Sequence, residues 1–178
     1  MYDAYKQVGK TKAVIVVPQA FGQSEKQPTE DPKHVRAMSY LAIVRGARGM
    51  FWYCWKQTGD WTGKQKQGMG WNPPTAKMVK TLIAEFKVFG QALLEPNPEF
   101  LTSDDGLVLG IVAGSEKTGR FLIYVNGDLE KRSNSAIKVP LKDGTELEPL
   151  FGGPQGAVKD GKIVLDLPAL ATGVFKIK

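Results

Sequence analysis

The stretch AVIVV, residues 13–17, decides the fold of this 178-residue chain, because it is an unbroken apolar run in which four residues are β-branched. Such a run, without polar alternation, is typical of a strand buried on both faces of a parallel sheet. A second run of this kind, MFWYCW at residues 50–55, follows a predicted helix. The two runs therefore predict neighbouring parallel strands joined by a crossover helix.

Two helices next to these strands have clear start signals. In Asp31–Pro32 and Asn72–Pro73, a capping side chain precedes a proline at the first helical position. The first helix is expected to end near Gly46 or Gly49. The second carries an apolar stripe at helical spacing, made of Met78, Val79, Leu82, Ile83, Phe86, Phe89 and Leu93. Residues 1–10 are expected to be the last turns of an earlier helix, and 56–70 a long polar loop.

The pattern changes after Pro98, where short apolar runs alternate with turn residues such as Asn126–Gly127 and Asp160–Gly161. The predicted strands are 107–113, 120–126, 135–140, 146–151, 162–167 and 173–177, and strands at this spacing favour an antiparallel β-sandwich. The predicted fold class is thus α/β plus all-β: a partial (β/α) barrel segment over residues 1–97, followed by a sandwich domain over residues 98–178.

Composition excludes several classes of function. The formal charge is +6, but the basic residues are spread along the chain with no run of five, so nucleic-acid binding is not expected. With one cysteine, Cys54, and one histidine, His34, the chain is expected to hold no metal or other cofactor and no Ser-His-Asp machinery. No apolar stretch is long enough to span a membrane. Met1 does not begin a signal peptide, and the sequence does not indicate a cellular compartment.

Several motifs together resemble the end of the barrel in bacterial glycoside-hydrolase-like proteins. They are VPQAFG at 17–22, Pro28–Thr29, RAMSYLA at 36–42, GARG at 46–49 and the aromatic strand after it. The helix at 73–94 resembles the closing barrel helix, and the segment after it, with FLIYVN at 121–126, resembles the small β domain that often follows such barrels. The resemblance implies a hydrolase fold and carbohydrate as the substrate class; such parent proteins are often secreted or periplasmic.

The chain departs from this family in its size. A complete (β/α)8 barrel takes about 250 residues and eight strands, whereas two barrel strands are recognisable here. The expectation is therefore a C-terminal fragment of a glycoside hydrolase that is inactive alone. Its two strands need a covering partner, which is the missing N-terminal barrel portion, a second copy of the chain, or its own helices and sandwich.

Catalytic residues are not expected in this chain. Glycoside hydrolysis needs two carboxyl groups, and the resemblance puts Gln19 where many barrel hydrolases have a nucleophilic Glu. A carboxamide cannot serve as nucleophile or base, but it can bind a sugar hydroxyl. Glu30 and Asp31 are better explained as acids of a first helical turn, and Glu25 as a solvated loop residue. The candidate substrate-binding residues are Gln19, Phe21, Trp55, Lys56, Asp60 and Trp61.

Aromatic residues beside the predicted strand ends have two interpretations. Rings at this position can stack on the apolar face of a pyranose while neighbouring polar groups satisfy its hydroxyls. For Trp52 and Tyr53 the favoured interpretation is packing in the core. For Trp55 and Trp61, ligand contact and packing remain open alternatives. The competing hypothesis for the whole chain is a non-catalytic module that binds glycan or itself.

Overall fold

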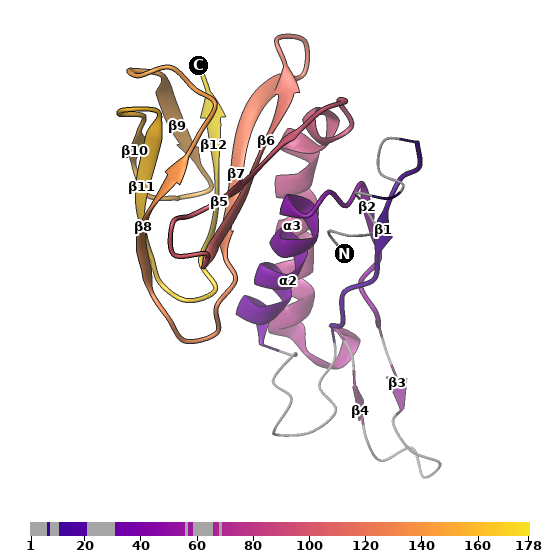
Figure 1. The fold of residues 1–178 in the computed structure, drawn as a ribbon. Coiled ribbons are helices and arrows are strands. Elements are labelled where there is room, and N and C mark those ends of the chain that lie inside the picture. Colours follow the sequence, from indigo (N-terminus) through magenta and orange to yellow (C-terminus); the bar gives the residue numbers. More distant parts are fainter. Residues whose placement is uncertain (1–6, 8–10, 21–30, 56, 59–65, 68) are drawn as a thin grey trace.

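The computed structural model describes residues 7, 11–20, 31–55, 57–58, 66–67 and 69–178. They are arranged in layers: a small parallel pair, two helices, a large antiparallel sheet, and a second strand pair on its far side (Figure 1). This confirms the predicted fold class of α/β plus antiparallel β structure. No helix within the described ranges is long and apolar enough to cross a membrane.

The parallel pair is formed as the sequence predicts, but it is short, and the predicted burial on both faces is wrong, because Ile15 and Val17 are exposed. Strand β1 (Ile15–Val16) pairs in parallel with β2 (Gly49–Met50), and an isolated parallel bridge between Gln19 and Tyr53 continues the pairing. The chain returns to it through helix α2, as a crossover connection requires. The predicted loop at 56–70 instead contains the two-residue strands β3 (Gln57–Thr58) and β4 (Lys66–Gln67), which pair with each other.

Both helices start where the capping signals predict. Helix α2 (Pro32–Val44) begins after Asp31, whose carboxylate accepts a hydrogen bond from Lys33 N at 2.7 Å. Helix α3 (Pro73–Leu93) follows the 3-10 turn η1 (Met69–Trp71) and begins after Asn72, which caps Thr75 N. The apolar stripe of α3 is buried at Val79, Leu82, Phe89 and Leu93, but Ile83 is exposed, contrary to prediction. The helix predicted at residues 1–10 lies outside the described residues, apart from Gln7.

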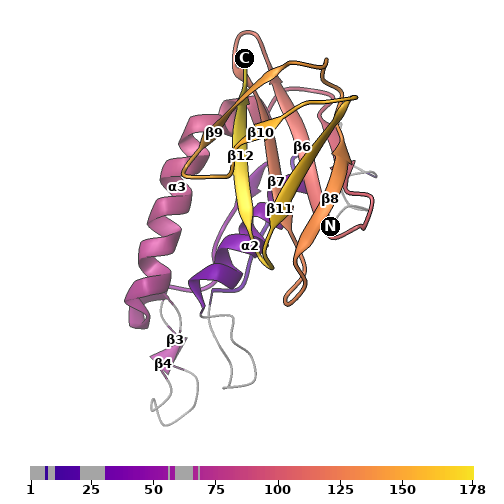
Figure 2. The ribbon, with the colours of Figure 1, turned by 90° about the vertical axis from the view of Figure 1, so that its left-hand side faces the viewer.

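The large sheet has the strand order β10-β9-β12-β7-β6-β5, and all of its pairings are antiparallel. Its strands are β5 (Glu99–Thr102), β6 (Val108–Ser115), β7 (Gly119–Asn126), β9 (Glu146–Leu150), β10 (Gly156–Ala157) and β12 (Thr172–Ile177). Two further strands, β8 (Ser133–Lys138) and β11 (Lys162–Leu167), pair with each other on the face away from the helices (Figure 2). The predicted strands are therefore present, whereas the edge strands β5 and β10 were not expected.

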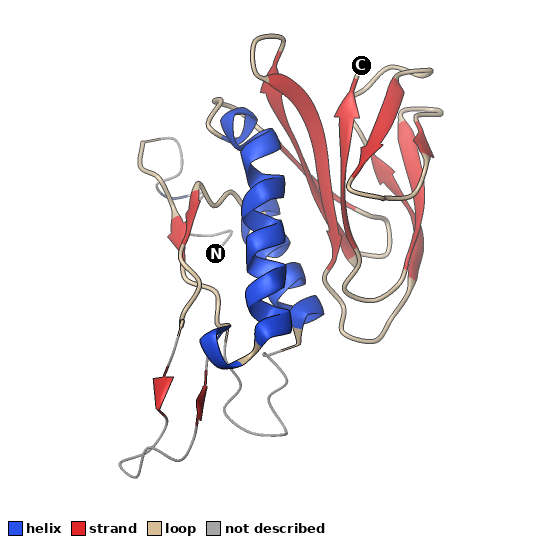
Figure 3. Cartoon of the chain, turned by 180° about the vertical axis from the view of Figure 1, so that it is seen from behind, coloured by secondary structure: helices blue, strands red, loops and turns tan. Residues whose placement is uncertain are grey.

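Two hydrophobic cores cover the two faces of the sheet. On one face Phe121, Ile123 and Val125 of β7 pack with α2 and α3, and on the other Leu122 and Tyr124 pack with β8 and β11. Figure 3 shows the helices lying between the small parallel pair and the large sheet. The first core thus joins residues on both sides of position 97, while the division into domains at that position stays a prediction.

Candidate functional site

The carboxyl-terminal ends of β1 and β2 bring Gln19 and Tyr53 side by side. Tyr53 N donates to Pro18 O at 3.0 Å, and Ala20 N donates to Tyr53 O at 2.5 Å. Gln19 is half-buried between these two backbone contacts. The expectation that the two strand ends are neighbours is therefore confirmed. In parallel α/β folds, ligands bind at these carboxyl-terminal strand ends.

Side chains after β2 alternate between two environments. Trp52 points toward the helices, where its ring stacks on Phe86 with centroids 6.2 Å apart and its Nε1 donates to Ser39 Oγ at 2.9 Å. Its neighbours Phe51 and Tyr53 are 66% and 51% exposed. Core packing is thus confirmed for Trp52 and wrong for Tyr53, because the described helices α2 and α3 lie on only one face of the pair.

The exposed side of the pair is apolar and aromatic. We call it the outer face; it consists of Ile15, Val17, Phe51, Tyr53 and Trp55, all more than half exposed. A strand pair of this kind is normally covered on both faces. Contiguous exposed apolar surface in a folded protein marks a site of interaction. The outer face is therefore the candidate functional surface, with Gln19 beside it.

Only part of the predicted binding set can be placed. Gln19 lies beside the outer face and Trp55 belongs to it, whereas Phe21, Lys56, Asp60 and Trp61 lie outside the described residues. Neither stretch 11–20 nor stretch 49–55 contains Asp or Glu, so these residues bring no acid–base pair to the strand ends. Partial burial raises the pKa of the Cys54 thiol, so the thiolate is disfavoured there.

A buried ion pair that sequence reasoning missed lies between the helices and the large sheet. Glu85 accepts from Arg36 Nη1 at 2.9 Å through Oε1 and from the Tyr40 hydroxyl at 2.7 Å through Oε2. Arg36 Nε also donates to Thr172 Oγ1 of β12 at 2.7 Å. Burial raises the pKa of Tyr40 well above its usual range, which keeps the phenol protonated as a donor. Because both oxygens of Glu85 are engaged inside the packed helices, its role is structural.

A metal centre is not formed by the part of the chain that the structure describes. No group of three or more His, Cys, Asp or Glu residues within those ranges is placed to hold a metal ion. His34, the single histidine, is half-buried on α2. The chemistry available at the outer face is therefore stacking by aromatic rings and hydrogen bonding by the Gln19 amide.

Comparison with solved structures gives a partial likeness in shape. No family model matches the sequence, and no curated protein matches it. Among solved structures, the chain is similar to an Anoxybacillus α-amylase described as giving insights into a new glycosyl hydrolase subclass, with a TM-score of 0.46 and 22% identity. The match covers 60% of this chain and 22% of that one, so this chain spans about a fifth of its length. Similarity at this level concerns the shape of part of the chain and does not assign an activity.

Proposed function

We propose that this chain is the C-terminal part of a larger glycoside-hydrolase-like barrel protein, and that it contributes sugar-binding surface but no catalytic carboxyl groups. The outer face is the observation that carries the proposal. Its five apolar side chains are exposed on the side of β1 and β2 that the helices leave open. Parallel strands with βα connections are stable when both of their faces are covered.

The proposed sugar contacts lie at the carboxyl ends of the strands. Tyr53 and Trp55 offer exposed rings for the apolar face of a pyranose, and the Gln19 amide, bridged to Tyr53 through the backbone, can donate to and accept from its hydroxyls. Ile15 and Phe51, nearer the amino ends, would instead pack against further strands of the barrel. The sugar site would then be completed by residues of those strands.

Catalysis by this chain alone is not part of the proposal. Glycosidases use two carboxyl groups about 5–10 Å apart, and the strand ends in the described residues carry an amide and aromatic rings. We expect no release of phenol from a panel of aryl glycosides by the purified chain. Release that is abolished by Asp60→Asn would contradict the proposal.

Binding is tested by isothermal titration with neutral oligosaccharides such as maltoheptaose and cellohexaose. Trp55→Ala is expected to weaken binding about tenfold, as loss of one aromatic contact does. Leu129→Ala is the matched control, because Leu129 is 68% exposed and lies in the connection between β7 and β8, outside the outer face. Equal affinities for wild type and Trp55→Ala would refute the assignment of the sugar site.

The coding sequence upstream of Met1 tests whether this chain is part of a larger barrel protein. An open reading frame that adds about six βα units with Asp or Glu at strand ends supports the proposal. A stop codon directly upstream would refute it.

A second candidate function is favoured by the same outer face. Its apolar side chains and the outer edges of β1 and β2 are suited to burial against a second copy of the chain, which makes a self-associating, non-catalytic module the alternative. Sedimentation equilibrium separates the two. A dimer that Phe51→Glu dissociates favours self-association, whereas a monomer at all concentrations rules it out.

A further inference from the structure

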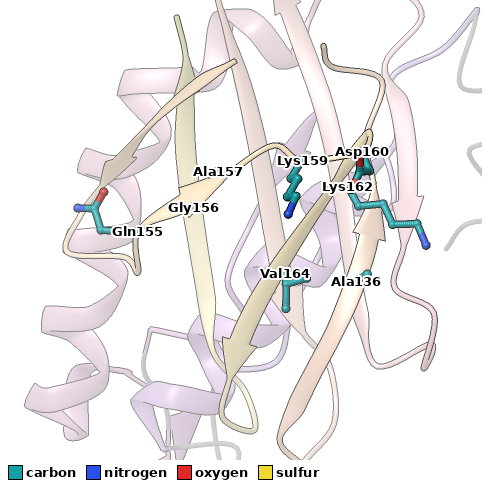
Figure 4. A pocket seen from close by; sticks show the side chains of 8 residues that line it. All are labelled: Ala136, Gln155, Gly156, Ala157, Lys159, Asp160, Lys162 and Val164. Atoms are coloured by element: carbon teal, nitrogen blue, oxygen red, sulfur yellow. The ribbon is translucent and has the colours of Figure 1, made fainter. Parts of the chain in front are cut away.

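A groove on the opposite side of the molecule, far from the outer face in the layer order, has no part in the function proposed above. It lies between β10 and the outward face of the β8–β11 pair and has a volume of about 610 Å³ (Figure 4). Its floor is made of small or short side chains: Ala136, Gly156, Ala157 and Val164. Val164 is 61% exposed, so this floor is open to solvent. The groove is within the size range of ligand sites in proteins.

Strand register places three lysines in one row at the end of this groove: Lys159 and Lys162 line it, and Lys138 lies next to Lys162 on the neighbouring strand. Lys162 of β11 pairs with Lys138 of β8, and it also forms an isolated bridge with Lys159, across the turn at Asp160–Gly161. The backbones of Lys159 and Lys162 exchange two hydrogen bonds of 2.9 Å, which fixes this pairing. Residues directly opposite on antiparallel strands share a face, with Cβ atoms about 5 Å apart. All three lysines are exposed.

The positive charge of this row is only partly balanced by nearby carboxylates, one of which, the exposed Asp160, lines the groove between Lys159 and Lys162. Asp143 is engaged by the backbone, because it accepts from Asp160 N at 2.9 Å and Gly161 N at 2.8 Å. Asp104 lies 3.6 Å from Lys162 Nζ, and both side chains are about half exposed, so this ion pair is weak. Like charges directly opposite on neighbouring strands repel one another. A bound anion would relieve that repulsion.

We propose that this groove binds a carboxylated polysaccharide, such as a chain of uronic acid residues. Successive strands are about 4.8 Å apart, which is comparable with the rise of one pyranose along an extended chain, so neighbouring lysines can meet neighbouring carboxylates. The shallow floor accepts the flat apolar side of a sugar ring, and the Gln155 amide at the other end of the groove can bind hydroxyls (Figure 4).

A polysaccharide suits the groove better than single-stranded nucleic acid. Binding of unpaired bases relies on aromatic rings on which the bases stack, and the eight residues that line the groove include no aromatic side chain and no arginine. The choice of a polysaccharide among polyanions rests on the proposed function, whereas the anionic character of the ligand rests on the lysine row alone.

The test compares two triple variants that remove the same charge. One is Lys138→Gln/Lys159→Gln/Lys162→Gln, and the control is Lys80→Gln/Lys87→Gln/Lys117→Gln, whose lysines are exposed on α3 and in the turn between β6 and β7. Isothermal titration with polygalacturonate at about 50 mM NaCl is expected to show affinity about tenfold weaker for the row variant and nearly unchanged for the control. Circular dichroism checks that both variants are folded.

Each outcome has a distinct meaning. Equal weakening in both variants, or none in the row variant, overturns the proposal. Oligonucleotide binding can be measured with the same variants. If it depends on the lysine row more strongly than polygalacturonate binding does, the choice of polysaccharide is overturned. Neutral oligosaccharides report on the outer face through Trp55→Ala, whereas polygalacturonate reports on the lysine row, so the failure of one proposal can be distinguished from the failure of the other.

Discussion

Replacing Glu85 with Gln tests whether the buried ion pair holds α2 and α3 together. Glu85 is 5% exposed, and its two oxygens accept from Arg36 and from Tyr40. The amide preserves the shape of the side chain and one acceptor oxygen. It removes the negative charge facing the guanidinium, and it turns an NH2 group toward one of two hydrogen-bond donors. The free energy of unfolding should therefore fall.

The size of the loss follows from the burial of both partners. Removing one partner of a fully buried pair costs about 3–5 kcal/mol. The Arg36 side chain is 20% exposed and keeps its hydrogen bond to Thr172, so water and this bond offset part of the loss. We expect the free energy of unfolding to fall by about 2–3 kcal/mol. With a urea m-value of about 2 kcal/mol/M, the unfolding midpoint moves down by about 1–1.5 M.

Urea unfolding followed by circular dichroism measures this midpoint. Glu148→Gln is the matched control, because Glu148 makes an exposed ion pair with Lys178 at 3.6 Å. Its midpoint should not shift resolvably. Salt at about 0.5 M should leave the effect of Glu85→Gln largely intact, since buried pairs are poorly screened. Equal midpoints for wild type and Glu85→Gln, or equal losses in the two variants, would refute the reasoning.

Three further predictions concern single positions. Gly173→Ala should lower stability by about 1–3 kcal/mol, because the added Cβ would lie 2.1 Å from the Tyr124 hydroxyl; an unchanged melting temperature contradicts this. Gly90→Ala should raise stability by about 0.5–1 kcal/mol, since the position is helical with nothing within 4 Å of the new Cβ; a lower melting temperature would show hidden crowding. The hydrogen bond from the Ser103 hydroxyl is the main cause that lowers the pKa of Asp105. Because the folded pKa lies below the unfolded value of about 3.9, this carboxylate stabilises the fold above that value, and the contribution is lost as pH falls through the folded pKa. Asp105→Asn should therefore lower the urea midpoint near neutral pH, and its difference from wild type should shrink as the pH falls through the folded pKa; a difference that stays constant down the acid range would argue against the assigned cause.

The sequence predicted those parts of the fold that depend on local chemistry. Asp31 and Asn72, each followed by proline, located both helix starts because capping and the fixed φ of proline act within one turn. Strand β5 was missed, since it follows directly after the helix stop at 95–98 and has no turn signal of its own. Ile83 was assigned to the buried stripe because periodicity shows the direction of a helical face but not how wide an arc its neighbours cover.

The candidate sites were predictable to different degrees. The proximity of Gln19 to the end of the second strand followed from parallel pairing alone. The exposure of Tyr53 did not, because it depends on what covers the pair and not on the strand itself. The lysine row depends on the register of β8 against β11, strands separated by more than twenty residues. One signal for it was present in the sequence: lysines flank the Asp160–Gly161 turn on both sides.

Strand β7 has a consequence for how substitutions are tolerated. Its residues from Phe121 to Asn126 are all buried, with alternate side chains committed to opposite cores, whereas β11 alternates between buried and exposed residues. In a saturation mutagenesis map, every position from Phe121 to Val125 of β7 should be intolerant of polar residues, whereas only alternate positions of β11 should be. A homologue search should therefore weight the run FLIYVN more heavily than any other strand, because Phe121–Val125 are constrained by volume and Asn126 by its hydrogen bonds to Lys131 O, Leu167 O and Pro168 O.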